Sequence, residues 1–252
     1  MKYNIIEFLV ILSLLTSCSN SSSRQVEGTG EQDNKSLNSG DNSTLQRKKK
    51  KENIVRRPVA TLKDFSYITN LGSVNIVYTQ GDYSIEVEGD SAMLQYLTTS
   101  FDSNLLTVSM RTDGNRDFNL YGNTSNVTMY ISCPDLKCVS ICGNGGFESR
   151  GTWSADDLQV GVLGTGTMSL DAIECNTFSM QSTSISLVSI ANLKANEATV
   201  MTRTSAIIDM NVDVEELIVL NDGKPKITLT GKAANLLIKN PKDETLVNNI
   251  KD

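Results

Sequence analysis

The segments VSICGNGGF (139–147) and VGVLGTGTM (160–168) decide the fold of this 252-residue chain. Each places a G-x-G motif directly after a run of β-branched and other apolar residues. A phosphate-binding loop would need a helix immediately after its glycines, but neither FESR nor TMSL begins a helix. We therefore expect the glycines to form corners between two strands, where they allow the chain to bend with positive φ.

The same spacing continues toward the C-terminus. One apolar column recurs at steps of 21, 20, 20, 19 and 19 residues, at Val139, Val160, Met180, Val200, Val219 and Ile238. A second column follows the corner, at Phe147, Met168, Ile185 or Leu187, Ile207 or Ile208, and Ile227. A fixed period near twenty with strand-length units is typical of a solenoid. The fold is therefore predicted to be all-β, a right-handed parallel β-helix-like solenoid with rungs of about 20 residues.

The preceding part of the chain, residues 61–132, is also rich in strand patterns, and residues 133–252 hold the regular rungs. Alternating segments at 74–79 and 83–88 predict a hairpin turning at Gln80-Gly81-Asp82. Two further strands are expected at 104–110 and 126–132, with an exposed loop between them.

One short helix is expected after Asp90 or Ser91, with Met93, Leu94 and Leu97 on one face. The tripeptide Asp90-Ser91-Ala92 also resembles a short O-glycosylation pattern, but helix capping is the simpler interpretation. A stack of strands leaves open sheet edges at both ends. We expect the hairpin and helix to cover one end, and the charged tail after Pro241 to cover the other.

The N-terminus carries a targeting signal. Lys2 precedes a short apolar run at 5–15 that ends in Leu15-Thr16-Ser17-Cys18. This run is too short to span a membrane. It resembles the lipobox of bacterial lipoproteins, which implies a signal peptide at 1–17 and lipid attachment at Cys18, with an ordinary secretory peptide as the alternative. The acylated chain would be anchored to the outer membrane of the cell envelope, on either its periplasmic or its surface face.

Residues 18–60 are predicted to be a disordered polar tether. The segment is rich in Ser, Asn, Gly and Asp and has too few large apolar side chains to form a hydrophobic core. The basic run RKKKK (47–51) is interpreted as a solvated stretch that extends the tether, with contact to anionic lipid as the alternative.

The composition excludes several functions. Histidine is absent, which removes Ser-His-Asp and Cys-His catalysis and most zinc sites. A net charge of −6 argues against nucleic acid as a partner. No residue set predicts a cofactor or a metal site, and the acidic and basic residues that face outward are scattered: Asp156, Asp157, Glu148, Arg150, Asp171 and Arg203. No catalytic residue is assigned.

Cysteine pairing stays open at this stage. Cys138 and Cys142 lie too far apart along one strand to form a disulfide. A bridge between Cys133 and Cys138 is conceivable, and mostly free or partly buried thiols are favoured for these residues and for Cys175.

Three aromatic residues are the candidates for ligand binding: Phe118 and Tyr121 in the exposed loop, and Trp153 between two rungs. Their rings could stack on sugars, or they could simply pack locally.

Residues 65–238 resemble the head GIN-domain family of auto-transporter adhesins, which is common among Bacteroidetes lipoproteins. The resemblance lies in FSYITNLGSVNIVYTQGDYSIEVEGDSAMLQYL, NLLTVSM and CPDLKCVSICGNGGFES, followed by the repeat. It implies a lipoprotein signal, an N-terminal β-rich piece and a β-helix-like stack. We therefore expect a non-catalytic adhesin that binds a glycan or a protein. The alternatives are an envelope structural or accessory protein without an external ligand, and a polysaccharide-acting β-helix enzyme. The oligomeric state stays open.

Overall fold

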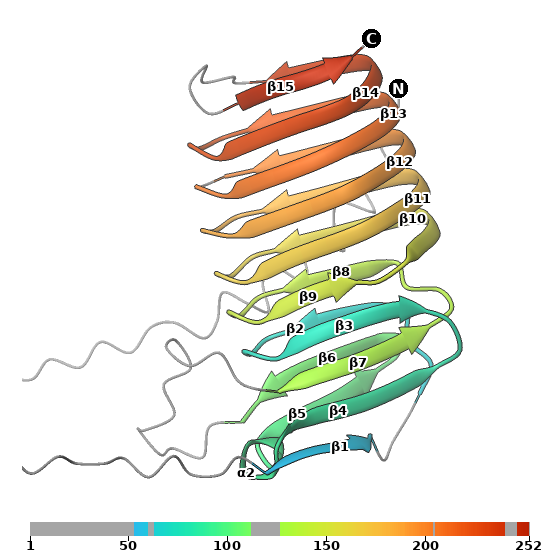
Figure 1. The fold of residues 1–252 in the computed structure, drawn as a ribbon, viewed down its shortest axis with the longest axis vertical. Coiled ribbons are helices and arrows are strands. Elements are labelled where there is room, and N and C mark those ends of the chain that lie inside the picture. Colours follow the sequence, from blue (N-terminus) through green and yellow to red (C-terminus); the bar gives the residue numbers. More distant parts are fainter. Residues whose placement is uncertain (1–52, 60–62, 112–126, 204, 240–245, 252) are drawn as a thin grey trace, which may run out of the picture. The chain divides into compact units, whose positions relative to one another are not determined.

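The computed structural model describes residues 53–59, 63–111, 127–203, 205–239 and 246–251 (Figure 1). The described residues are almost entirely strands, and they build a β-solenoid of about five turns with rungs of about 20 residues. The predicted fold class is thus confirmed.

Short strands form the N-terminal part of the stack. They are β1 (Ile54–Pro58), β2 (Tyr67–Asn70), β3 (Asn75–Gln80), β4 (Ser84–Asp90), β5 (Leu97–Asp102), β6 (Leu105–Met110), β7 (Thr128–Cys133), β8 (Cys138–Ile141) and β9 (Gly146–Ser149). A single turn of helix, α2 (Ser91–Leu94), lies between β4 and β5.

Long, bent strands form the C-terminal part. They are β10 (Thr152–Val162), β11 (Thr167–Ser182), β12 (Leu187–Thr202), β13 (Ile207–Asn221) and β14 (Lys226–Lys239), followed by the short β15 (Leu246–Lys251). Each of β11 to β14 runs through a bend, so that its first half lies in one ladder of the solenoid and its second half in the other.

The two ladders are joined by four-residue corners. One ladder runs β5-β6-β2-β8 and continues through β10 into the second halves of the long strands. The other runs β1-β4-β7-β3-β9 and continues into their first halves. In Figure 1 the corners lie along one edge of the stack and the bends along the opposite edge.

The first apolar column predicted from the sequence is confirmed in every step. Val139, Val160, Met180, Val200, Val219 and Ile238 are successive register partners. Ile68 and Leu106 extend the same column below Val139. Aligned inward side chains give the stack a continuous apolar core, and each fully buried aliphatic residue contributes about 1.5–3 kcal/mol.

The second column needs one correction. Its third member is Val188, which pairs with Met168 and Ile208 and is fully buried. Ile185 and Leu187, the expected members, are exposed. Side chains alternate across a strand, so Leu187 must face outward when Val188 faces inward. Ile208, rather than Ile207, is the inward residue of the next rung.

The hairpin predicted at Gln80-Gly81-Asp82 is wrong. β3 and β4 do not pair with each other, because β7 lies between them, parallel to β3 and antiparallel to β4. The backbone N–H of Gly81 donates to the carbonyl of Cys133 at the end of β7 (3.3 Å). Three connecting residues suffice, since two strand spacings amount to only about 9.6 Å.

The predicted helix is present but shorter than expected. Asp90 is its N-cap, and the amide of Ala92 donates to Asp90 Oδ1 (2.9 Å). The helix ends at Leu94, and Leu97 already begins β5. The antiparallel pairing of β5 with β6 therefore overrides the helical pattern.

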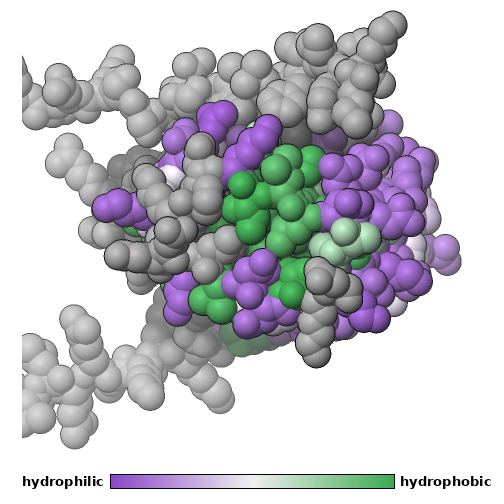
Figure 2. Space-filling view, turned by 90° about the horizontal axis from the view of Figure 1, so that it is seen from above, coloured by the Kyte–Doolittle hydropathy of each residue, from purple (hydrophilic) through white to green (hydrophobic). Residues whose placement is uncertain are grey.

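The two ends of the stack also differ from expectation. At the N-terminal end β1, β4, α2 and β5 form the cover, while β2-β3 and β6-β7 are complete rungs rather than parts of a cap. At the other end, residues 246–251 do not simply cover the edge but add a strand to the first half of β14. Figure 2, seen from the C-terminal end, shows apolar side chains among polar ones.

The corner glycines confirm the structural interpretation but for a different reason. Among the described glycines only Gly151 and Gly231 have positive φ, so the expected positive φ at Gly164 is wrong. A Cβ on Gly164 would instead lie 2.5 Å from the carbonyl oxygen of Cys142 in the rung below. Close approach of successive corners therefore requires glycine here.

We predict that Leu193→Ala lowers the free energy of unfolding by about 2–5 kcal/mol, because Leu193 is only 1% exposed in the core. Leu187→Ala on the same strand is the matched control and should change it by less than about 0.5 kcal/mol, since Leu187 is 48% exposed. Urea denaturation of both variants measures the difference. Equal destabilisation would contradict the assigned orientation of β12.

We predict that Gly164→Ala destabilises the solenoid strongly, because the added methyl group would overlap the backbone of the neighbouring corner. Gly161→Ala should be tolerated, since the nearest atoms to its Cβ lie 3.8 and 3.9 Å away. Thermal unfolding of the two variants provides the comparison, and a Gly164→Ala protein as stable as Gly161→Ala would refute close approach of the corners.

Candidate functional site

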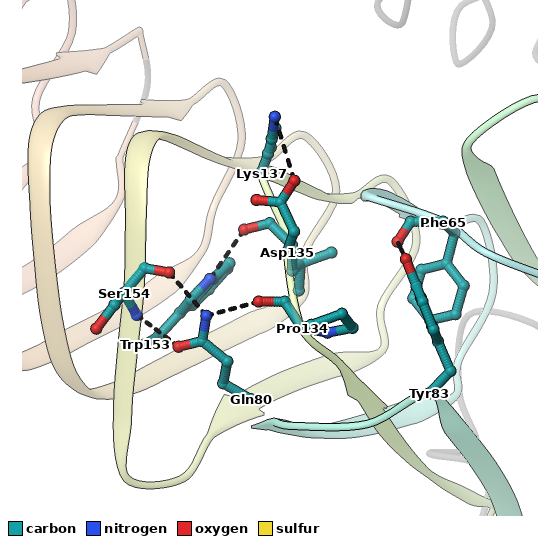
Figure 3. Close-up of polar contacts among 9 residues, drawn as sticks. Phe65, Gln80, Tyr83, Pro134, Asp135, Lys137, Trp153 and Ser154 are labelled. Atoms are coloured by element: carbon teal, nitrogen blue, oxygen red, sulfur yellow. Dashed lines mark hydrogen bonds and ion pairs between the residues drawn. The ribbon is translucent and has the colours of Figure 1, made fainter.

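Trp153, the aromatic candidate that the structure describes, lies in the core rather than at a binding surface. Its side chain is 1% exposed and packs against Tyr78 and Phe147, with ring centroids 5.0 and 5.8 Å away. Its Nε1–H donates to the carbonyl of Leu136 (3.0 Å) (Figure 3). An indole enclosed in this way has no free face for a sugar ring, so the expected stacking role for Trp153 is corrected to core packing.

Gln80 fixes the chain segments around this indole. Its Nε2 donates to the carbonyls of Pro134 and Ser154, both at 2.8 Å, and its Oε1 accepts from the amide of Ser154 at 2.8 Å (Figure 3). One amide side chain thus ties the end of β3 to the β7–β8 connection and to β10. This polar cluster is satisfied internally and offers no free group to a ligand.

The other predicted site residues, Cys18, Phe118 and Tyr121, lie outside the described residues. The segment that contains Phe118 and Tyr121 joins β6 to β7, where the other rungs have a four-residue corner.

A column of alternating charge runs along the opposite edge, where the long strands bend. Glu174, Lys194, Asp213 and Lys232 are successive register partners on β11, β12, β13 and β14, and all are exposed. We call these four residues the charged column. Neighbouring rungs lie about 4.8 Å apart, so the column extends about 14 Å along the stack.

Two shallow cavities flank the charged column, with volumes of about 490 and 370 Å³, and the four charged residues line both of them. We call the two cavities together the bend groove. Besides the charged column, the larger cavity is lined by small or partly buried side chains and by two polar ones. These residues are Cys175, Ala195, Val214, Ala233, Ala234, Asn196 and Glu215. The small side chains leave the depression that the longer charged ones border.

Amide side chains form ladders beside the groove. Asn196 Nδ2 donates to Asn176 Oδ1 (2.7 Å), and Asn211 Nδ2 donates to Asn192 Oδ1 (3.3 Å). Each bond joins equivalent positions of adjacent rungs. The bend groove therefore presents donors, acceptors and charges of both signs at the regular spacing of the stack.

The thiol in the groove is a poor nucleophile. Burial, with a smaller contribution from the nearby carboxylate of Asp157, raises the pKa of Cys175 to about 11. Cys175 is a free cysteine, as are Cys133 and Cys138, so the conceivable bridge between Cys133 and Cys138 is absent. A protonated thiol can contribute packing and a weak hydrogen bond, but little thiolate for covalent chemistry.

The scattered acidic and basic residues do not converge. Glu148 and Arg150 form an exposed pair, with Arg150 Nε 2.7 Å from Glu148 Oε1. Thr177 Oγ1 donates to Asp157 Oδ1 on the neighbouring rung. Within the described residues no group of three His, Cys, Asp or Glu side chains is placed to hold a metal ion. The same part of the chain contains no helix of the length and hydropathy needed to cross a membrane.

Sequence reasoning missed the bend groove because it followed the apolar columns alone. The aligned repeat already contains the signal: Glu174, Lys194, Asp213 and Lys232 recur at steps of 20, 19 and 19 residues. What the spacing could not reveal is that the small neighbours of these residues leave an open depression.

Raised thiol pKa values make stability depend on pH. Burial raises the pKa of Cys133 to about 12 and that of Cys138 to about 11, against about 8.5 in an unfolded chain. The folded state thus holds these protons more tightly, so its stabilisation is complete below pH 8.5 and is lost as pH rises toward 11–12.

We therefore predict that the free energy of unfolding, measured with urea, falls between pH 8 and pH 11. The fall should be smaller in the Cys133→Ala/Cys138→Ala double variant. An identical slope in the two proteins would show that these thiols do not ionise on unfolding.

Comparison with known proteins gives relatives of the same fold. A family model described as "Putative auto-transporter adhesin, head GIN domain" matches residues 64–191. The crystal structure of a "putative adhesin" from Bacteroides fragilis NCTC 9343 superposes with a TM-score of 0.60 at 18% identity, over 79% of this chain and 96% of that one. A "putative adhesin" from Parabacteroides distasonis ATCC 8503 gives a TM-score of 0.54 at 13% identity, over 79% and 96%. No curated protein matches the chain.

Proposed function

This chain belongs to the family described as "Putative auto-transporter adhesin, head GIN domain", and on that premise we propose that it is a non-catalytic binding protein of the cell envelope. The proposal has two parts. Cys18 carries a lipid that anchors the chain to the outer membrane, and the bend groove of the solenoid holds the ligand.

The bend groove is the observation that carries the proposal. It combines two adjoining cavities of about 490 and 370 Å³ with four charged side chains in register on consecutive strands. A repeating surface of this kind makes the same weak contact several times along an extended ligand. Several weak contacts within one ligand add up to useful affinity, because only the first association carries the full entropic cost.

The chemistry of the groove favours a polar ligand with little net charge. Within the charged column the two carboxylates of Glu174 and Asp213 balance the two ammonium groups of Lys194 and Lys232, and Glu215 at the border of the larger cavity adds one negative charge. Asparagine ladders beside the column supply the donors and acceptors that sugar hydroxyls or peptide groups need. A glycan fits this description best. An extended polar segment of a protein is the second candidate ligand.

An envelope structural role is the alternative function. It is favoured by the alternation itself, since opposite charges on neighbouring strands stabilise a sheet by about 0.2–1 kcal/mol per pair. In that case the charged column only holds the rungs together. A polysaccharide-acting enzyme finds less support, because the described residues include no group of three His, Cys, Asp or Glu side chains placed to hold a metal ion.

The groove is tested by binding of the purified protein to a glycan array and to envelope protein extracts. We expect Lys194→Ala/Asp213→Ala to weaken the binding at least tenfold while leaving the unfolding midpoint nearly unchanged. Arg57→Ala is the matched control, since Arg57 is an exposed cation on β1, away from the bends. The structural alternative would be favoured if the groove variant bound as well as the parent protein. It would also be favoured if no ligand were found and the groove variant unfolded at a lower midpoint than the parent.

The anchor is tested separately in cells. With Cys18 intact we expect the protein in the membrane fraction and labelled by a fatty acid precursor. Cys18→Ser should abolish the labelling and release the protein into the soluble fraction. A Cys18→Ser protein that stays with the membrane in salt-free buffer and still carries the label would contradict lipid attachment at this residue.

A further inference from the structure

Three aliphatic side chains stand exposed together near the corner edge of the solenoid. Ile185 is 68% exposed, Leu187 48% and Ile207 45%. Leu187 and Ile207 are register partners on neighbouring strands, and Ile185 lies in the corner directly before β12. We call these three residues the aliphatic patch. Exposed aliphatic residues that adjoin one another mark contact surfaces more often than single ones do.

Cations border the aliphatic patch. Lys226 is the register partner of Ile207 on the next strand, Lys224 lies in the corner before it, and Arg203 begins the corner between β12 and β13. Two exposed carboxylates, Asp209 and Asp222, are on the same strands and corners, so the border has one cation in excess in a protein of net charge −6.

Within the part of the chain that the structure describes, these cations form no ion pair. In the described part of the chain the ion pairs involve Arg56, Lys137 and Arg150. Arg203, Lys224 and Lys226 form none of them. Three unpaired cations beside exposed aliphatic side chains are therefore free to meet an anionic partner.

We propose that the aliphatic patch and its bordering cations dock the solenoid on the surface of an anionic phospholipid bilayer. Aliphatic side chains enter the boundary between headgroups and acyl chains, while basic side chains remain at the level of the lipid phosphates. The patch contains none of the aromatic residues that usually dominate protein–protein contacts, which makes a lipid surface the better match. The contact requires no acyl group on Cys18.

This docking also orients the bend groove. Corners and bends lie along opposite edges of the stack (Figure 1). A solenoid resting on the bilayer by its corners therefore turns the charged column away from the membrane. The lipid-facing and ligand-facing edges would then be separated by the width of the rung.

The test uses the secreted chain with Cys18→Ser, so that no acyl group contributes, in co-sedimentation with vesicles. Vesicles of phosphatidylcholine alone are compared with vesicles that also contain phosphatidylglycerol. We expect binding to the anionic vesicles and much weaker binding to the neutral ones. Lys224→Gln/Lys226→Gln should reduce binding roughly 25-fold, since each lysine near an anionic surface contributes about fivefold.

A second pair tests the apolar part. Ile185→Ser/Leu187→Ser should lose at least tenfold in vesicle binding, while Leu237→Ser, at an exposed leucine of β14 in the other ladder, should bind as the parent does. Circular dichroism of each variant confirms that the fold is kept. Equal binding to neutral and anionic vesicles, or patch variants that bind like Leu237→Ser, would overturn the proposal. Patch variants that lose only self-association or capture of a protein would overturn it as well.

Discussion

Backbone pairing between successive rungs, in register, is the constraint on which the rest of this molecule depends. Once Val160 is paired with Val139 and Met180, every other position of those rungs is aligned as well. Inward apolar residues then form a continuous core. Outward residues form columns in which neighbouring side chains are separated by the distance between paired strands, about 4.8 Å. The groove, the aliphatic patch and the corner glycines are three outcomes of this one alignment.

The inward column was predictable because the hydrophobic period is regular and because burial restricts residue type at every step. The second column was less certain, since β12 begins with apolar residues on both faces and only pairing with Met168 identifies Val188 as the inward one. The separation of β3 from β4 could not be read from the sequence, because a short turn with alternating flanks fits a hairpin equally well.

In the candidate site, too, some features could be predicted from the sequence and others depend on tertiary contacts. Trp153 was singled out for its residue type, but its environment depends on Tyr78, Phe147 and the carbonyl of Leu136, which come from three separate parts of the chain. The groove was present in the sequence as a periodic charge pattern, whereas its depth depends on Cys175, Ala195 and their neighbours at the bend. The periodicity of the sequence was enough to predict the fold. The candidate binding surface could be identified only from the three-dimensional arrangement of the side chains.

The position of β2 and β3 between two rungs that come later in the sequence has a consequence for biogenesis. A chain synthesised from its N-terminus produces these two strands early, yet their partners β6, β7, β8 and β9 follow only as far on as residue 149. One edge of this rung therefore lacks its partners until β6 and β7 have emerged, and the other edge until β8 and β9 have emerged, about 70 residues after the end of β3. Unpaired edges of this kind are prone to pairing with other chains. Nascent molecules of this topology would benefit from a holding chaperone until the neighbouring rungs arrive.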